Sequence, residues 1–403
     1  MRVRTVTLAN YRNYEQQSIE ASPSVNIFLG RNAQGKTNIL EGIWYAALGR
    51  SHRARTDAEA RKRQEEAVAQ AEETLAQARL EAEQIINEAA GRLSLETERR
   101  GVKYALEFRF FRNRRRQIFL GGQPIPTRDL IGTLNVVLFS PEDLLFVKGA
   151  PEGRRRFLNM ELSQADATYF YDLAVYTRLL SQRNALLKRL RERGGRPEEL
   201  QPWDVQLAEK AVRVVQKRQE AVKKLSDFAG EVHQRLTGGE EKLTIEYRRH
   251  GPDEVAEALL SWYNNTLRDS AAADIRRGST GVGPHLDDLI LKVNGAELRA
   301  YGSQGQQRTG VLSLKLAELE FLRKATGEYP VLLLDDVMSE LDGGRRKELL
   351  SFLQRENIQT FITATDAAYF PAAIPGTVFT VEQGTIREAA AGNGHEREES
   401  EEF

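Results

Sequence analysis

One octapeptide constrains the fold of this chain more than any other feature. Residues 30–37 read GRNAQGKT and fit the pattern G-x-x-x-x-G-K-[ST] in full. The β-branched and apolar run SVNIFL (24–29) precedes them and predicts a strand, whereas NILEGIWYAAL (38–48) has the apolar spacing of a buried helix. A strand, a glycine loop and a helix in this order predict a phosphate-binding loop inside an α/β fold.

The residue types of this loop suit a nucleoside triphosphate such as ATP. Gly30 and Gly35 allow the backbone to curl, so that successive N–H groups and the positive helix end point at phosphate oxygens. We expect Lys36 to reach the β- and γ-phosphates and the Thr37 hydroxyl to bind Mg²⁺. The alternative is an ordinary glycine-rich turn that matches by chance. The candidate nucleotide-binding residues here are Gly30, Arg31, Asn32, Ala33, Gln34, Gly35, Lys36 and Thr37.

A second motif, VLLLDD (331–336), supplies acidic partners for the loop. Four apolar residues that end in Asp335 and Asp336 predict a buried central strand with its carboxylates at the carboxyl edge of a parallel sheet. We expect Asp335 to hold Mg²⁺, directly or through water, and Asp336 to polarise the attacking water as general base. Two adjacent acids at a strand end can instead cap a helix or a turn.

A third motif, YGSQGQQRTG (301–310), lies just before an apolar helix predicted over 309–324. Ser303, Gly305 and Gln306 would form a second anion-binding helix N-terminus. One chain cannot easily fold both helix ends onto one nucleotide, whereas two chains placed head to tail can, as in ABC-type ATPases. SELD (339–342) occupies the place of the D-loop that such proteins keep at the same interface. The motif order therefore predicts an ATP-dependent homodimer.

Composition limits the remaining chemistry. The chain has no cysteine and five scattered histidines, which excludes disulfides, iron–sulfur clusters and thiol catalysis and leaves little for a zinc site. Basic and acidic residues number 58 each, so nucleic acid would have to meet local basic patches. The sequence has no apolar run of membrane-spanning length and no signal-like start, so we expect a cytoplasmic protein without a membrane partner.

The rest of the chain divides into a discontinuous core and a helical part. Strand patterns cover 2–9, 93–98, 103–111, 117–120, 243–247 and 288–293, and the polar segment 11–23 is typical of a turn. Helical spacing extends from 141 to about 236, with a break at 194–202. We predict an ATPase core over 1–135 and 240–390, a helical lobe over 136–239 and a disordered acidic tail over 391–403.

Residues 57–91 differ in composition from the segments around them. They are rich in alanine, glutamate, glutamine and arginine and predict one long helix inserted into the core. Their alanine stripe repeats every eleven residues, which is typical of a straight or slightly right-handed helical pair. Because alanine buries little area, the stripe would hold a partner only weakly. A solvated projecting helix and a partner-binding arm are both open.

Several longer segments resemble one family. They are LANYRNYE, GRNAQGKTNILEGIWYAALGRSHR, VVLFSPEDLLFVKGAPEGRRRFLNMEL, QRNALLK, PWDVQLAE, GVGPHLDD, YGSQGQQRTGVLSLKLAELE and VLLLDDVMSELD. Together they resemble the RecF family of bacterial recombination mediators, DNA-dependent ATPases related to the heads of SMC proteins and Rad50. The resemblance implies an ABC-type P-loop ATPase head with a mixed sheet core and an inserted helical lobe. It also implies a dimer that binds DNA at gaps or single-strand/double-strand junctions and acts with RecO and RecR in recombinase loading, DNA repair and the SOS response.

The resemblance implies further residue roles. Arg12 and Asn13 match a segment that meets the nucleotide in this superfamily, although Arg12 can also be an ordinary surface arginine. ABC proteins usually have a histidine after the last core strand, where this chain has Thr365 and Asp366. Asp336 stands where many ABC ATPases have glutamate, and its shorter side chain fits the slow turnover of a switch.

Two basic clusters are the candidate DNA contacts, because clustered arginines suit phosphates and position DNA without reading its sequence. The first is Arg112, Arg114, Arg115 and Arg116, and the second is Arg154, Arg155 and Arg156. Exposed basic turns are often only solvated, and part of the second cluster can instead brace the fold. The main alternative function is a structural SMC- or Rad50-like head with a partner-binding arm. Such proteins need hundreds of residues of coiled coil, and this chain has room only for a short hairpin.

Overall fold

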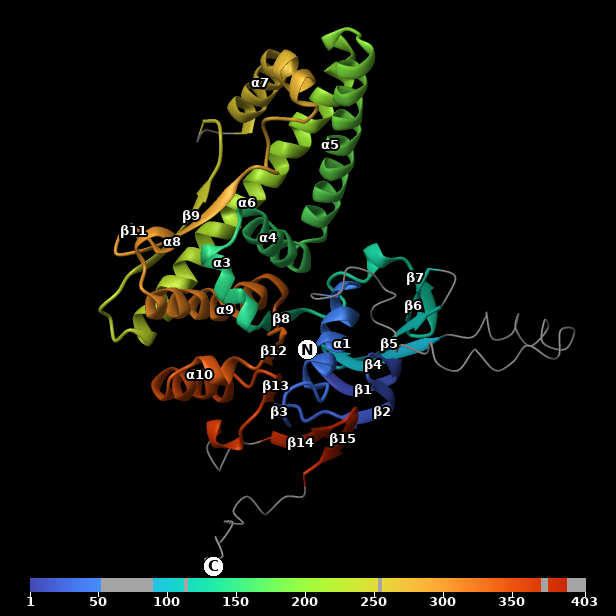
Figure 1. The fold of residues 1–403 in the computed structure, drawn as a ribbon, viewed down its shortest axis with the longest axis vertical. Helices are drawn as coiled ribbons and strands as arrows, with labels where there is room; N and C mark the ends of the chain where they lie inside the picture. The colour runs from blue at the N-terminus through green and yellow to red at the C-terminus, as the bar shows by residue number, and fades with distance from the viewer. Residues whose placement is uncertain (52–89, 112–114, 253–255, 371–375, 390–403) are drawn as a thin grey trace, which may run out of the picture. The chain divides into compact units, whose positions relative to one another are not determined.

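The computed structural model describes residues 1–51, 90–111, 115–252, 256–370 and 376–389 (Figure 1). They form two compact units. The first comprises Met1–Leu130 and Val331–Phe403, and the second comprises Ile131–Pro330. The helix predicted over 57–91 falls outside the described residues up to residue 89, and Gly91 already belongs to a strand. The acidic tail predicted over 391–403 lies outside them as well.

The first unit contains an antiparallel sheet with the order β2-β1-β4-β5-β6-β7. Its strands are β1 (Arg2–Tyr11), β2 (Tyr14–Glu20), β4 (Gly91–Arg99), β5 (Val102–Phe110), β6 (Gln117–Leu120) and β7 (Gln123–Ile125), with the 3-10 turn η1 (Thr127–Asp129) after them. Strand β2 corrects the prediction of a turn over 11–23. It lies at the sheet edge and buries only Tyr14 and Ile19, so its sequence lacks the apolar alternation of an inner strand.

A second sheet of the first unit positions the functional motifs. Within it the strands β15 (Thr385–Glu388), β14 (Gly376–Glu382), β3 (Val25–Leu29), β13 (Thr360–Ala364) and β12 (Val331–Asp335) follow one another in this order. The four strands from β14 to β12 are parallel, and β15 is antiparallel to β14. Strands β12 and β13 are buried throughout. The apolar run of β12 predicts this burial, whereas β13 buries two threonines as well.

The described helices of the first unit each come after one of these strands in the chain. Helix α1 (Lys36–Leu48) begins directly after the glycine loop and is buried along most of its length, with Tyr45 packed against Phe108 and Phe110 of β5. After β12 come η4 (Val337–Glu340) and α10 (Gly343–Arg355), and after β13 comes η5 (Ala367–Tyr369). Because parallel strands end at the same edge, the segments after β3, β12 and β13 meet there.

The second unit is mainly helical. Its helices are α3 (Leu145–Lys148), α4 (Pro151–Ala165), α5 (Ala167–Arg193), α6 (Gln201–Leu236), α7 (Ala256–Arg277), α8 (Leu298–Tyr301) and α9 (Gln304–Thr326), with the 3-10 turns η2 (Pro141–Leu144) and η3 (Pro197–Leu200). Figure 1 shows α5 and α6 as a long antiparallel pair with α7 beside it. The predicted break at 194–202 separates α5 from α6. Among the described residues, no helix combines the length and apolarity needed to cross a bilayer.

Strands of the second unit accompany this helical pair. They are β8 (Val136–Phe139) and the small sheet β11 (Ala296–Glu297), β10 (Asp288–Val293) and β9 (Leu243–Arg248). Both β9 and α9 pack against α6. For this reason residues 240–330 are part of the second unit, whereas the sequence-based division had assigned them to the core with 1–135.

Candidate nucleotide-binding site

The loop over residues 30–35 joins β3 to α1, and its two glycines are required for different reasons. Gly35 has a φ of 110°, which favours glycine, and a Cβ there would lie 2.4 Å from the Asn13 Nδ2 atom. Gly30 does not have a positive φ, but a Cβ there would lie 2.4 Å from the carbonyl oxygen of Val381 in β14. Gly30 therefore allows a close approach between two backbones rather than the predicted curl.

Lys36 lies folded over the loop. Its Nζ donates hydrogen bonds to the carbonyl oxygens of Gly30, at 2.6 Å, and Arg31, at 2.8 Å. Burial lowers the pKa of the Lys36 ammonium, and the nearby Asp336 and Asp335 carboxylates oppose that shift. The ammonium is thus held partly out of water inside the curve of the loop, where a phosphate oxygen would be a strong partner.

The glycine-loop and acidic motifs meet at one hydrogen bond. Thr37 Oγ1 donates to Asp335 Oδ1 at 2.8 Å, between residues 298 positions apart in the chain. Hydroxyl and carboxylate oxygens are suitable ligands for Mg²⁺, which usually also binds substrate phosphates. Among the described residues, no group of three or more acidic, histidine or cysteine side chains could hold a metal by itself. Thr37 and Asp335 therefore fit a Mg²⁺ ion whose remaining ligands come from a nucleotide and water.

The Asp336 carboxylate does not cap the turn that follows it. Asp336 has a φ of 53° and precedes η4 without making a side-chain capping bond. Its Oδ1 atom is buried and has no hydrogen-bond partner in the described part of the chain. Burial raises the pKa of the Asp336 carboxyl, Lys36 lowers it and Asp335 raises it. The capping alternative thus does not apply to Asp336, and its unpartnered oxygen can accept a proton.

Thr363 is a residue of this site that the sequence analysis missed. It lies opposite Asp335 in the parallel register of β12 and β13. Its Oγ1 donates to Asp335 Oδ1 at 2.8 Å and accepts from the Asp336 backbone N–H at 2.9 Å. The sequence-based candidates near the end of β13 were Thr365 and Asp366, two and three residues later. Asp366 instead caps η5 by accepting from the Ala368 N–H at 2.8 Å.

Residues at the turn between β1 and β2 form hydrogen bonds to the glycine loop. Asn13 Nδ2 donates to the Gln34 carbonyl at 3.0 Å, and the Tyr14 hydroxyl donates to the carbonyl of the next loop residue at 3.0 Å. Arg12 Nε donates to Glu41 Oε2 in α1 at 2.8 Å, and the Arg12 side chain is only 17% exposed. Arg12 is therefore tied to the helix that follows the loop and is not an ordinary surface arginine.

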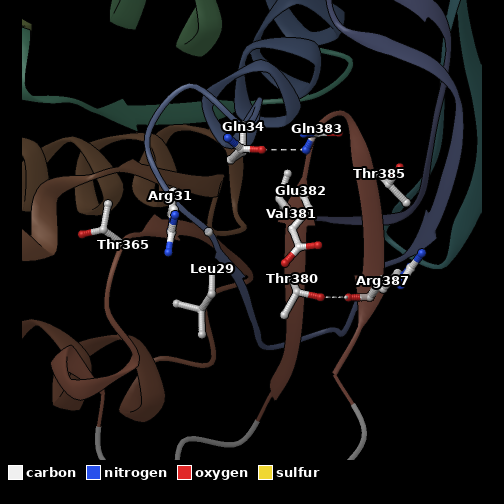
Figure 2. Close-up of a pocket in the computed structure, with 11 residues that line it drawn as sticks. Leu29, Arg31, Gln34, Thr365, Thr380, Val381, Glu382, Gln383, Thr385 and Arg387 are labelled. Carbon is white, nitrogen blue, oxygen red and sulfur yellow. Dashed lines mark hydrogen bonds between the residues drawn. The ribbon is translucent and has the colours of Figure 1, made fainter.

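A polar cavity of about 900 Å³ lies beside the loop. Figure 2 shows Arg31 and Thr365 on one side of it and the hairpin of β14 and β15 on the other. The hairpin is attached to the loop because the Gln383 backbone N–H donates to Gln34 Oε1 at 2.7 Å. The loop residues Arg31 and Gln34 thus face a space large enough for a small ligand.

The third motif, in the second unit, opens a helix earlier than expected. Ser303 is the N-cap of α9, so the helix begins at Gln304 rather than at 309. The Ser303 hydroxyl accepts from the Gln306 N–H at 3.2 Å, and Gln306 Oε1 accepts from the Ser303 N–H at 2.9 Å. Ser303 and Gly305 are exposed. A capped, exposed helix N-terminus of this kind presents its positive end to the surface.

The first basic cluster is only partly described, because Arg112 and Arg114 lie outside the described residues. Arg115 is exposed. Arg116 donates to the Tyr45 hydroxyl and to the Gly49 carbonyl, and its guanidinium lies 5.2 Å from the centre of the Tyr45 ring. Arg116 thus braces the end of α1, whereas Arg115 keeps its side chain in solvent.

The second basic cluster needs a correction. Arg154 is 3% exposed and forms a two-pronged ion pair with Asp288, at 2.7 and 2.8 Å. It also donates to the Gly149 carbonyl at 2.9 Å. Its prediction as a DNA contact is wrong, because its donors already serve groups within the second unit. Arg155 donates to the Asp287 carbonyl at 2.8 Å, while Arg156 is exposed.

Comparison with known proteins gives one consistent family. Residues 2–387 match the family model described as the RecF/RecN/SMC N terminal domain. The chain is 42% identical over 367 residues to the DNA replication and repair protein RecF of Heliobacterium modesticaldum, which covers 91% of this chain and 92% of that protein. It is 36% identical to the RecF protein of Natranaerobius thermophilus, with 98% and 100% covered.

Solved structures agree with this family. A structure described as the recombination mediator protein RecF-ATP in the RecFOR pathway has a TM-score of 0.83 and 34% identity, with 96% of this chain and 97% of that chain covered. An SMC head bound to the C-winged helix domain of ScpA has a TM-score of 0.53 at 13% identity, which shows a likeness of fold alone. The mixed α/β fold predicted from the sequence, an ABC-type ATPase head, is confirmed. The chain belongs to the bacterial RecF family.

Proposed function

We propose that this protein is a cytoplasmic, ATP-dependent DNA-binding mediator of recombination and repair. It dimerises on ATP binding, recognises gapped or junction DNA and helps to load the recombinase together with RecO and RecR. The names of its relatives support this proposal, since they are DNA replication and repair proteins and include RecF with ATP in the RecFOR pathway. The observation that carries it is the hydrogen bond between Thr37 and Asp335, which joins the phosphate loop to the acidic strand.

In ATP hydrolysis, the loop would bind the phosphates, and the two acids would bind the metal and accept a proton. The backbone N–H groups of residues 31–36 and the Lys36 ammonium hold the phosphates. Thr37 and Asp335 would hold Mg²⁺, which would neutralise charge on the phosphate oxygens. Asp336 accepts the proton of the attacking water, and its unpartnered Oδ1 supports this role. Its short side chain supports slow turnover.

The dimer uses the third motif of each chain. The N-terminus of α9, at Ser303–Gln306, binds the γ-phosphate of the ATP held by a second copy. Its exposure and its capping box support this role, because the positive helix end is rigid and accessible. ATP would thus favour the dimer by contacting both chains, and its hydrolysis would release them.

Light scattering tests this proposal in the presence of ATP or ADP, with and without gapped duplex DNA. We expect a dimer with ATP, a monomer with ADP, and faster ATP hydrolysis when gapped DNA is added. The variant Lys36→Arg should hydrolyse ATP more slowly with its fold intact. It keeps the positive charge, but the guanidinium is larger than the ammonium and would contact the phosphates differently. A monomer under every condition would contradict the proposal. A dimer that ignores DNA would favour an SMC-type structural head instead.

A further inference from the structure

Exposed cations of the second unit gather where α5 and α7 end. Residues 188–199 carry five cations against three acids, and α7 closes with two more arginines. All seven of these cations are exposed. We call this group the tip patch; it consists of Lys188, Arg189, Arg191, Arg193, Arg196, Arg276 and Arg277.

The two halves of the tip patch form one surface. Arg191 Nη1 donates to the backbone carbonyl of Arg277 at 3.4 Å. A Cβ on Gly278 would lie 2.8 Å from Arg191 Nη1 and 3.4 Å from Lys188 Cγ. The last turn of α5 therefore lies against the segment that follows α7, and cations far apart in the sequence are neighbours.

A small apolar core supports the tip patch. Leu186, Leu187 and Leu190 of α5 pack with Leu200 and with Ala271 of α7. Trp203 and Ile275 pack against the same cluster. Because three helices and the loop between two of them contribute to it, the cations project from an ordered base.

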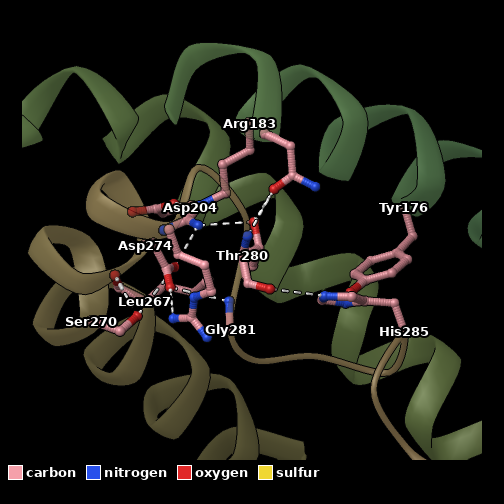
Figure 3. A network of polar contacts seen from close by, with 11 residues as sticks. Tyr176, Arg183, Asp204, Leu267, Ser270, Asp274, Thr280, Gly281 and His285 are labelled. Atoms are coloured by element: carbon pink, nitrogen blue, oxygen red, sulfur yellow. Dashed lines mark hydrogen bonds and ion pairs between the residues drawn. The ribbon is translucent and has the colours of Figure 1, made fainter. Parts of the chain in front are cut away.

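A buried ion-pair network joins the same three helices (Figure 3). Arg183 of α5 is fully buried, and its guanidinium lies 2.6 Å from Asp204 of α6 and 2.8 Å from Asp274 of α7. It also donates to the Thr280 hydroxyl at 2.9 Å. Breaking such a network is costly, so the relative positions of the helix ends are well determined. A surface positioned in advance loses little entropy when it binds.

The tip patch has more charge than its structural setting requires. Arg189 pairs with Glu199 and Arg277 with Asp274, but Lys188, Arg193 and Arg276 form no ion pair within the described residues. Cations also favour helix C-termini, yet each end carries only about half an elementary charge. Two helix ends would therefore offset about one positive charge. A net positive field remains at the surface.

We propose that the tip patch binds the phosphate backbone of duplex DNA without reading its sequence. Arginine forks match phosphate oxygens and are weakly hydrated, which favours this partner. Single strands are usually held by base stacking on aromatic side chains. The exposed large aromatic residues of the described chain are Tyr171 and Tyr301, neither of which belongs to the tip patch. The inference rests on the proposed function only in that it takes DNA as the partner.

A charge-reversed pair tests this inference against a matched control. The test variant carries Arg193→Glu and Arg276→Glu. The control carries Lys223→Glu and Lys224→Glu, two exposed positions of α6 about 33 Å along the helix from its first residue. Both variants change the net charge equally and leave the nucleotide-binding residues unchanged. Fluorescence anisotropy with a blunt 30-base-pair duplex, about the length of three helical turns, is measured at several KCl concentrations with ATP.

We expect the test variant to bind the duplex at least tenfold more weakly than the control. Its salt dependence should fall by about two units of log–log slope, since about 0.9 is lost for each phosphate contact. Equal affinity and slope in the two variants would overturn the inference. Light scattering with ATP on the same samples separates the two proposals. If the wild-type protein dimerises but binds no DNA, both the tip patch and the proposed function are contradicted. If the wild type, the test variant and the control bind DNA equally, only the tip patch is contradicted.

Discussion

Thr363 links the two carboxylates of the nucleotide site. Its hydroxyl donates to Asp335 Oδ1, which also accepts from Thr37, and it accepts from the backbone N–H of Asp336. One side chain thus orients Asp335, the proposed Mg²⁺ ligand, and holds the left-handed backbone from which the second acid projects. Groups that orient metal ligands commonly change metal affinity or activity by about 10–100-fold when they are removed.

Replacing Thr363 by valine should therefore slow ATP hydrolysis about tenfold or more and raise the Mg²⁺ concentration needed for half-maximal rate. Thr363→Ser keeps the hydroxyl and should restore both values. Thr360→Val is the matched control, because Thr360 is also buried in β13 but donates to the Ile358 carbonyl. The measurement is the steady-state rate against Mg²⁺ concentration. Wild-type rate and Mg²⁺ dependence in Thr363→Val would contradict the role.

Arg154 is the residue for which local sequence is most misleading. The run Arg154, Arg155 and Arg156 has the composition of a solvated basic turn, yet its first member is buried in an ion pair with Asp288 of β10. The partner lies 134 positions away, so no local pattern reveals it. A helix turns about 100° per residue, so three adjacent side chains point to different sides.

Arg154→Met should destabilise the protein by about 3–5 kcal/mol, because Asp288 is left as a largely buried charge without its partner. Arg156→Met removes an exposed arginine from the same helix and should cost less than about 0.5 kcal/mol. Urea unfolding measures both values. If the two variants were equally stable, the assignment of Arg154 to the fold would be wrong.

At the scale of elements, α4 and α9 are joined by a buried group of charges. Lys315 Nζ of α9 lies 2.9 Å from Glu318 Oε1 and 3.9 Å from Asp143 Oδ1. Burial raises the pKa of Glu161 of α4 to about 7, with Lys315 lowering it and Asp143 raising it. Burial also raises the pKa of Glu318 well above its ordinary value, although the Lys315 ammonium 2.9 Å away lowers it. Both carboxyl groups therefore hold a proton more tightly than usual, and the proton of Glu161 is lost near pH 7.

The stability of the second unit should consequently depend on pH. The pKa of Glu161 is higher in the folded state than the ordinary value of 4.5, so its proton stabilises the fold fully below pH 4.5. That contribution is lost as pH rises toward about 7, by about 1 kcal/mol per pH unit. Glu161→Gln should weaken this dependence, while Glu152→Gln, at an exposed position of α4, should keep it unchanged. Thermal unfolding across this pH range measures the effect, and identical profiles for both variants would refute it.

Elements with mainly apolar sequences could be predicted more readily than a polar edge strand. Strands β3 and β12 are mostly apolar and buried on both faces, and their composition predicts them. Strand β2 is an edge strand with mainly polar residues. Helix α7 was not predicted, although its buried positions Leu259, Tyr263, Leu267 and Ala271 recur every fourth residue, which is a helical spacing. Tertiary context decided β2.

For the whole molecule, local motifs predicted chemistry better than they predicted organisation. The glycine loop and the acids of β12 could be recognised because each needs particular residue types in adjacent positions. The supporting contacts of Asn13, Tyr14 and Thr363 depend on pairings between distant strands and could not be read from spacing. The same reason explains the division of the chain, since the packing of β9 and α9 on α6 brings residues 240–330 into the second unit.

In the proposed dimer, Ser303 of a second copy completes each nucleotide site. Two variants disable different parts of it. Lys36→Ala removes the ammonium of the loop, and Ser303→Arg places a large cation at the exposed N-terminus of α9. Each variant alone should hydrolyse little ATP, because every site of its dimer lacks one part. A mixed dimer would contain one site with both parts intact.

Mixing the two variants therefore tests the claim most directly. The measurement is the ATP hydrolysis rate of the mixture against each variant alone, at equal total protein and with gapped DNA present. If the site is shared between chains, the mixture regains hydrolysis that neither variant has. If loop and helix N-terminus act within one chain, the mixture stays as inactive as its components, and the account of the dimer is contradicted.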